Sequence, residues 1–343
     1  MAEGQVMATN AEILEYLELP DTIVTALGSK EVSVYQPARN QFLNAIVNKI
    51  LYQYVDSPNV NNPFEKYDGA PINYGDTIEN VYTRLPKGYK FDPNATDPFT
   101  KKKPEVITLY GTINYEMQYE VTIEDALLRR AVLSEYGFMN LINKILGNMP
   151  KRMRLDHYFA TLRMLNNQDL YADGFEKVTR GATDEETAKV VTRKIVDTVT
   201  SFALPSTANN ALGEYQITDK SKVLLIIKQE LLNSINLDYL AGVYNLSKVD
   251  LINNIIPVQS FQVQQEDEDG KTTTIGEDLD FIILDTDGFD MHKALEDGGE
   301  IYNPKGKYTN HFLNSWKVFA FKYYFNARAF KLSAASSAAS NAE

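Results

Sequence analysis

Residues 105–133 read EVITLYGTINYEMQYEVTIEDALLRRAVL, and this stretch decides the fold. From Val106 to Val121 apolar or aromatic residues occupy most odd positions and polar residues most even positions, which is the alternation of a β-strand with two different faces. At about 3.3 Å per residue this run would be roughly 50 Å long, whereas ordinary strands span about 17–20 Å. One core cannot cover so long an apolar face, so the pattern predicts that another subunit covers part of it.

The period changes from two to helical at Thr122. Thr122 is the predicted N-cap of a helix, with Asp125 at the third helical position and Glu124 adding favourable charge at the positive end of the helix dipole. Apolar residues then recur at helical spacing. The pattern predicts that a long helix, from about Ile123 to Leu146, follows the strand almost directly.

Gly147 and Pro150 interrupt this helical pattern. Proline removes a backbone donor and clashes with the preceding turn, so we expect a kink or a brief break there. A second helix is predicted from about Lys151 to Asn166. Its basic cluster at residues 151–154 is interpreted as the solvated face of a helix.

A second strand candidate precedes the long strand, at Gly75–Leu85. If the two strands pair, they form a long hairpin whose tip, Pro86–Pro104, contains three consecutive lysines, Lys101, Lys102 and Lys103. A hairpin alone is marginally stable in water, which again points to an external partner.

The other predicted elements follow from the same periodicities. They are an acidic arm at Met1–Val34, a helix after Pro37, a loop at Ser57–Asn73, a helix at Ala182–Ala203 capped by Thr183, buried strands at Lys222–Ile227 and Asp280–Leu284, a helix at Gln229–Tyr244, a strand at Ile255–Val263, a solvated acidic loop at Glu266–Lys271 and one or two strands within Trp316–Leu332.

Composition limits the possible functions of the 343-residue chain. A hydrophobic content of 44% suffices for a core, and the absence of cysteine excludes disulfides, thiol nucleophiles and cysteine-ligated metals. The formal net charge of −12 argues against nucleic-acid binding by the whole surface. No apolar run predicts secretion or membrane insertion.

FIILDTDGF, residues 281–289, is the strongest enzymatic signal. It resembles the first motif of haloacid-dehalogenase-type phosphatases, in which Asp285 would be the nucleophile and Asp287 the acid/base beside Mg²⁺. Phe289 departs from that motif, and few residues follow it, so the two aspartates are interpreted as turn residues after a buried strand. The three histidines, His157, His292 and His311, are interpreted as packing or surface residues. We therefore expect no catalytic, cofactor or metal site.

The chain contains 21 tyrosines, a residue type that is enriched at protein interfaces. Tyr82, Tyr89 and Tyr110 are predicted to lie on the outer face or towards the tip of the hairpin. Together with the three tip lysines, they form the predicted inter-subunit contact.

The order of these elements resembles the major capsid proteins of tailed double-stranded DNA bacteriophages, which have the α+β Hong Kong 97 type fold. The stretches GDTIENVYTRLP, YGTINYEMQYEVTIEDALLRRAV and VLLIIKQELLNSINLDYLAGVYN are similar in texture to major head proteins of phages that infect Gram-positive bacteria. In that family an extended hairpin, the E-loop, precedes a spine helix, a peripheral P-domain and a central A-domain. The resemblance implies the following division: N-arm 1–34, joining helix and loop 35–74, E-loop 75–121, spine helix and P-domain 122–180, A-domain 181–290, return strands of the P-domain 291–332 and tail 333–343.

The resemblance also implies a structural function. Pentamers and hexamers of the chain would form an icosahedral shell that encloses double-stranded DNA in the virion, after assembly in the host cytoplasm with scaffolding, portal and decoration proteins as possible partners. The E-loop would lie over a neighbouring subunit, which independently explains the long strand. Three alternatives remain open: an encapsulin-type nanocompartment, a fibre or adhesin-like protein, and the magnesium-dependent phosphatase.

Overall fold

The computed structural model describes residues 58–73, 75–90, 101–124, 135–235, 254–266 and 272–333, with no side-chain description for 135–143. The predicted amino-terminal arm, the helix after Pro37 and the carboxyl-terminal tail lie outside these residues, apart from Ser333. The chain divides into two compact units. The first contains 1–60, 119–152 and 298–313, and the second contains 61–118, 153–297 and 314–343.

The second unit is built on a five-stranded mixed sheet with the order β4-β12-β9-β5-β6. Its strands are β4 (Phe175–Thr179), β5 (Val223–Lys228), β6 (Ile255–Val258), β9 (Phe281–Asp285) and β12 (Ala327–Ser333). The predicted apolar runs form β5 and β9, which pair antiparallel at the centre of the sheet. All five residues of β9 are buried, so the prediction of strands covered on both faces is confirmed.

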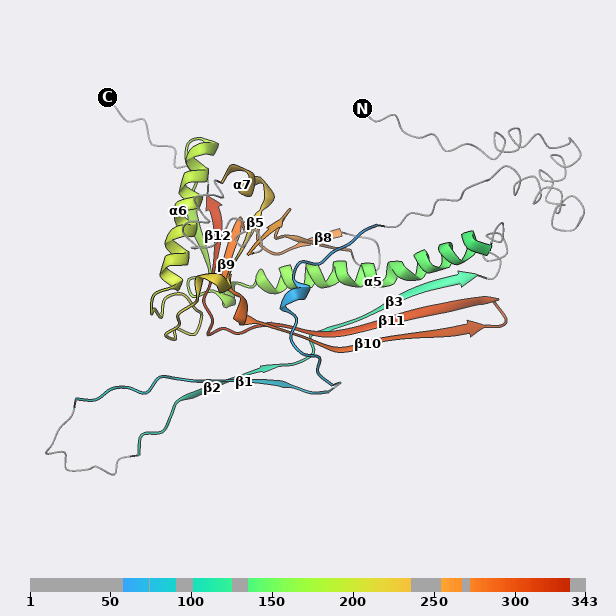
Figure 1. Cartoon of the computed structure of the whole chain (residues 1–343), viewed down its shortest axis with the longest axis horizontal. Coiled ribbons are helices and arrows are strands. Elements are labelled where there is room, and N and C mark those ends of the chain that lie inside the picture. Colours follow the sequence, from blue (N-terminus) through green and yellow to red (C-terminus); the bar gives the residue numbers. More distant parts are fainter. Residues whose placement is uncertain are drawn as a thin grey trace, which may run out of the picture. The chain divides into compact units, whose positions relative to one another are not determined.

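Helix α6 (Asp184–Phe202) covers one face of this sheet (Figure 1). Its apolar stripe, Val191, Ile195, Val199 and Phe202, packs in one cluster with the odd-numbered residues of β5. The Thr183 side chain accepts a hydrogen bond from the Glu186 N–H, which confirms the predicted N-cap.

The opposite face of the sheet meets the carboxyl-terminal part of helix α5 (Glu135–Leu165). Leu162 and Leu165 of α5 share a cluster with Leu224 and Ile226, the even-numbered residues of β5. Because consecutive strand residues point to opposite faces, one short apolar run supplies both layers of the core.

The predicted two helices are one helix, because α5 continues through Pro150 without a break. A proline in a helix removes a single backbone hydrogen bond, so packing on either side can hold the helix together. Met149 and Met153, which flank Pro150, are both buried. The prediction of a break was therefore wrong, and the predicted kink stays a prediction.

The predicted single strand at 106–121 is two strands that belong to different sheets. Strand β2 (Val106–Gly111) pairs antiparallel with β1 (Ile78–Thr83), so the predicted hairpin is confirmed. Strand β3 (Tyr115–Glu124) instead joins a three-stranded sheet with the order β10-β11-β3. Between them Asn114 exchanges two hydrogen bonds with the Phe319 backbone, and this side-chain contact ends the continuous ladder.

The predicted helix start at Thr122 was also wrong. Thr122 lies within β3, and its hydroxyl donates to Asn310 Oδ1 at 2.8 Å. Residues 125–134 lie outside the described residues, and the described part of α5 begins at Glu135. A threonine that bonds across a sheet is part of a strand whatever its capping propensity.

The other two strands of this sheet are longer than the sequence predicts. Strand β10 (Phe289–Asn303) pairs with β11 (Tyr308–Phe321) through a turn in which Lys307 has a positive φ of 53°. The residue pattern alone predicts no strand at β10, whereas the resemblance implies return strands within 291–332. With β12, these two strands confirm the predicted strand-rich carboxyl end.

Smaller elements complete the described chain. They are η2 (Glu65–Tyr67), η3 (Gln168–Leu170), η4 (Lys220–Lys222), α7 (Gln229–Ser234), the paired strands β7 (Val263–Glu266) and β8 (Thr272–Ile275), and η5 (Thr286–Gly288). The described α7 is shorter than its prediction because Ile235 is buried in an extended conformation. The predicted strand 255–263 is divided between β6 and β7, since the fully buried Phe261 lies in the bend between them.

Candidate functional site

The β1–β2 hairpin has two chemically different faces. Directly opposed residues of an antiparallel pair share a face, and the register places Glu79 opposite Tyr110, Val81 opposite Thr108 and Thr83 opposite Val106. These pairs form the outer face. The pairs between them, such as Tyr82 with Ile107, form the inner face.

The outer face carries three exposed apolar or aromatic residues among its polar ones. Val81 is 55% exposed, Val106 51% and Tyr110 67%, and Leu85 just beyond β1 is also exposed. Isolated apolar residues on a surface are ordinary, but several on one face of a projecting hairpin are typical of an interaction site. Tyr110 Oη lies 3.5 Å from Glu79 Oε1, so its ring lies on this face beside a carboxylate.

Two contacts hold the inner face of the hairpin against the rest of the second unit. Asn80 donates to Asp290 Oδ2 at 2.6 Å, and Tyr82 stacks on Tyr324 with 4.7 Å between ring centroids. Burial raises the pKa of Tyr82, and Glu214 raises it further. The hairpin is therefore fixed along one face while the opposite face remains exposed.

Arg84 adds a charged contact at the end of β1. Its Nε lies 2.6 Å from Glu214 Oε1, and its Nη1 lies 3.1 Å from Glu105 Oε2. Hydrogen bonds to Glu105 and Glu214 raise the pKa of the Arg84 guanidinium. The contact links the two hairpin segments to the loop that follows α6.

The described part of the hairpin end is basic and exposed. Lys102 Nζ lies 3.1 Å from the centre of the exposed Tyr89 ring, a cation–π contact. Lys101 and Lys103 are exposed on either side, and residues 91–100 lie outside the described residues.

The predicted contact residues are thus placed on different surfaces. Tyr89, Tyr110 and the three lysines are exposed, but Tyr82 lies on the inner face, against Tyr324. The sequence prediction omitted Val81, Leu85 and Val106. Their alternation was visible, but only the strand register shows which residues of β1 and β2 share a face.

Asp285 and Asp287 form a structural turn. Asp285 Oδ1 accepts from the Asp287 N–H at 3.0 Å, and Asp285 Oδ2 accepts from the Thr218 hydroxyl at 2.7 Å. Burial raises the pKa of Asp285, and Asp287 forms an ion pair with Lys222 at 2.5 Å. A carboxylate that is 2% exposed and bonded through both oxygens is poorly placed to attack a substrate. The interpretation as turn residues after a buried strand is confirmed.

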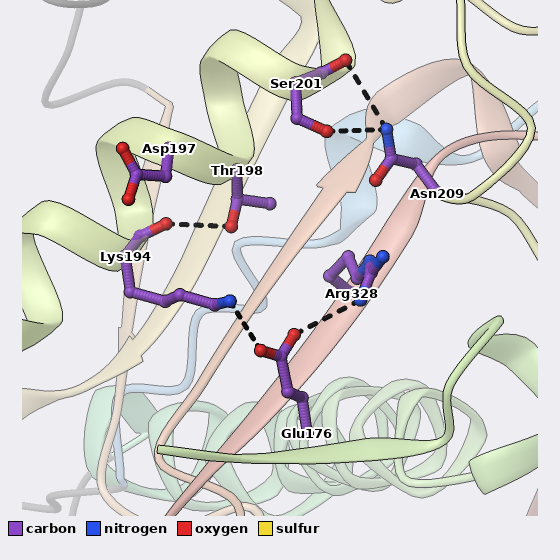
Figure 2. A pocket seen from close by; sticks show the side chains of 7 residues that line it. All are labelled: Glu176, Lys194, Asp197, Thr198, Ser201, Asn209 and Arg328. Atoms are coloured by element: carbon purple, nitrogen blue, oxygen red, sulfur yellow. Dashed lines mark hydrogen bonds and ion pairs between the residues drawn. The ribbon is translucent and has the colours of Figure 1, made fainter. Parts of the chain in front are cut away.

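A pocket of about 230 Å³ lies between α6, β4 and β12 (Figure 2). Glu176 is one of its lining residues and bridges Lys194 at 2.5 Å and Arg328 at 3.2 Å. Arg328 also pairs with Asp173 at 2.6 Å, so two carboxylates balance the two cations, and the cluster links a helix to two strands of the sheet.

The three histidines occupy unrelated positions. His157 is buried, with Nε2 2.9 Å from Ser315 Oγ, and burial lowers its pKa to about 3. His292 contacts the Ala70 carbonyl, and His311 lies near Glu300. Within the described ranges no three or more His, Asp or Glu side chains are grouped to hold a metal ion, and no described helix is long and apolar enough to cross a membrane.

Comparison with known proteins identifies the family. Residues 22–331 match the model of the Phi29-like phage major capsid protein. The major capsid protein of Bacillus phage B103 is 26% identical over 306 residues, which cover 87% of this chain and 65% of that protein. The major capsid protein of Streptococcus phage Cp-1 is 26% identical over 243 residues, 66% of each chain. The chain thus spans slightly less than two thirds of the length of these relatives.

Solved structures show the same fold. A chain from the capsid of Staphylococcus phage Andhra matches with a TM-score of 0.65 and 12% identity, over 83% of this chain and 88% of that chain. A chain from the mature capsid of bacteriophage PhiM1 matches with a TM-score of 0.59 and 10% identity, over 83% of this chain and 91% of that chain. The fold is therefore the α+β Hong Kong 97 type, and the comparisons do not support the encapsulin or phosphatase alternatives. Because the family model matches most of its length, the chain belongs to the Phi29-like phage major capsid protein family.

Proposed function

We propose that this chain assembles with copies of itself, as pentamers and hexamers, into the icosahedral shell of a phage head that encloses double-stranded DNA. The single observation that carries the proposal is the exposure of Val81, Val106 and Tyr110 on the outer face of the β1–β2 hairpin. Family membership supports the same function.

The energetics favour burial of this face by a neighbour. Fully burying an apolar side chain contributes about 1.5–3 kcal/mol, so three such residues supply a useful part of a contact. A hairpin of one copy that covers a different surface of the next is a head-to-tail contact, and such contacts close into rings when the rotation permits. Because the same contact is repeated between every pair of neighbours in a ring, each contact can be weak and the ring can still be stable.

The segments of the chain take separate parts in this proposal. The hairpin within 75–121 acts as the E-loop, the helix within 122–180 as the spine, 181–290 as the A-domain and 291–332 as the returning P-domain strands, with an arm at 1–34, a joining segment at 35–74 and a tail at 333–343. The function is structural, without catalysis or a cofactor. Shells would assemble in the host cytoplasm, where scaffolding, portal and decoration proteins are the expected further partners.

Electron microscopy and light scattering of the purified protein test this proposal. We expect closed shells, or rings of five or six, from the intact chain. Deleting Lys87–Lys103, or replacing both Val81 and Val106 by Asp, should abolish or alter them. Val190→Asp, on the exposed face of α6, is the matched control and should assemble normally. Normal assembly of the Val81/Val106 variant would show that the outer face is not the contact.

A further inference from the structure

The end of the hairpin differs in charge from the rest of the chain. The chain has a net charge of −12, yet Lys87 and Lys90 on one side of the hairpin end and Lys101–Lys103 on the other are all exposed. Arg84 and Glu105, at the base of this end, already form an ion pair. The described hairpin end therefore presents cations that its own base does not neutralise.

Strand β3 carries the opposite charge on one face. Glu116, Gln118, Glu120, Thr122 and Glu124 occupy its alternate, exposed positions. Gln118 and Thr122 bond Asn314 and Asn310 of the neighbouring β11, so the polar residues between the glutamates are occupied by neutral amides. Among the residues that the structure describes, none of the three carboxylates has a cationic partner.

The three carboxylates are far enough apart to remain charged side by side without a cationic partner. Side chains four residues apart on a strand are about 13 Å apart, which exceeds a Debye length of roughly 8 Å at physiological salt. Repulsion within the row is therefore small in the free chain. Among the strands that the structure describes, β3 lies at the edge of its sheet, a position at which a second chain can approach.

We propose that the lysines at the hairpin end of one copy lie on the carboxylate row of β3 in a second copy. This inference rests on the proposed function and names the surface that receives the hairpin. The exposed apolar and aromatic residues on the outer face of the hairpin would supply most of the affinity. The lysine–glutamate pairs would fix the register, because peripheral charge pairs contribute mainly to orientation and to the rate of association.

Charge reversal and rescue test the pairing. Replacing Lys101, Lys102 and Lys103 by Glu, or replacing Glu116, Glu120 and Glu124 by Lys, should each lower the assembled fraction at least tenfold. A chain with all six substitutions should recover most of it. The matched control replaces three exposed lysines elsewhere, Lys177, Lys305 and Lys307, by Glu and should assemble like the parent.

Crosslinking separates failure of this inference from failure of the proposed function. A carbodiimide joins lysines directly to carboxylates that contact them, and a mixture of ¹⁴N and ¹⁵N protein marks links between copies by mass. We expect inter-copy links from 101–103 to Glu116, Glu120 or Glu124. Shells that form without these links, and without a response to charge reversal, would overturn this inference alone. A monomer with no inter-copy links at high concentration would overturn both.

Discussion

Asn114 and Phe319 bond to each other in both directions. Asn114 Nδ2 donates to the Phe319 carbonyl at 2.8 Å, and the Phe319 N–H donates to Asn114 Oδ1 at 2.9 Å. The Asn114 side chain thus makes the two hydrogen bonds that a neighbouring strand would otherwise make with the Phe319 backbone. Asn114 lies between β2, which belongs to one sheet, and β3, which belongs to another. We expect Asn114→Ala to lower the free energy of unfolding by about 1–3 kcal/mol, because both backbone groups of Phe319 lose their partner.

Urea denaturation measures this loss. Gln118→Ala is the control, since it removes an exposed amide pair with Asn314 and should change stability by less than about 0.5 kcal/mol. Equal effects of the two substitutions would show that Asn114 does not organise the junction.

Lys317 and Asp68 form a buried ion pair between β11 and the segment that precedes the hairpin. Lys317 is 1% exposed, and its Nζ lies 2.6 and 2.8 Å from the two Asp68 carboxylate oxygens. Burial lowers the pKa of Lys317, and Asp68 opposes that shift. We expect Lys317→Ala to cost about 3–5 kcal/mol, since it leaves a carboxylate uncompensated.

An exposed pair provides the comparison. Lys189→Ala breaks the pair with Glu185 on the surface of α6 and should change stability little, because solvent screens an exposed ion pair. In a thermal unfolding series, a Lys317→Ala variant as stable as Lys189→Ala would contradict this ranking. Lys317→Met, which fills more of the site, should lose less than Lys317→Ala.

His157 makes stability dependent on pH. Its ring contacts Tyr115 and Phe319, the cations facing it are Lys317 and Lys293, and its pKa is lowered from 6.5 to about 3. The unfolded chain therefore binds one more proton than the folded chain between these values. This contribution to stability is complete above pH 6.5 and is lost as the pH falls towards 3, by about 2 kcal/mol at pH 5.

Unfolding free energies between pH 7 and pH 5 measure this slope. His157→Gln keeps a polar group that can reach Ser315 but cannot be protonated. Its unfolding free energy should therefore fall less steeply with decreasing pH, by a slope that corresponds to the uptake of up to one proton. Gln118→Ala, which removes no titratable group, is the control and should keep the parental slope. If His157→Gln keeps it as well, His157 is not the group that titrates.

Tyr82 and Arg84 are expected to hold the hairpin in place without contributing much to global stability. Tyr82→Ala removes the stack on Tyr324, and Arg84→Ala removes the contacts with Glu214 and Glu105. Amide hydrogen exchange in 78–83 and 106–111 should become at least tenfold faster in the double variant, while β5 and β9 remain protected. Val81→Ala on the outer face should leave exchange unchanged. Unchanged exchange in the double variant would show that other contacts orient the hairpin.

The candidate site could be predicted only in part from the sequence. The exposure of residues 101–103 is evident from composition, because charged residues at a hairpin end are solvated in almost any fold. The exposure of Tyr110 follows from the alternation along the strand, which places it on the even-numbered, polar face. Val81, on the other strand, could not be assigned to the exposed face. A shift of one residue in register exchanges the two faces of a strand, and the register of β1 with β2 is a property of the folded pair.

Local sequence alone determined the elements whose stabilising groups lie close together in the chain. Thr183 caps α6 by accepting a hydrogen bond from the N–H of Glu186, three residues later. The continuous apolar runs at 223–228 and 281–285 become central strands, because exposing them to water would cost free energy in any arrangement of the chain. Only the tertiary structure decided where the alternating run at 106–121 divides. The periodicity continues unchanged through that point, but the partner that divides it, Phe319, lies 205 residues from Asn114 in the sequence. A hydrogen bond between residues so far apart in the sequence does not affect the local pattern around either of them. Only folding of the chain brings the two residues together.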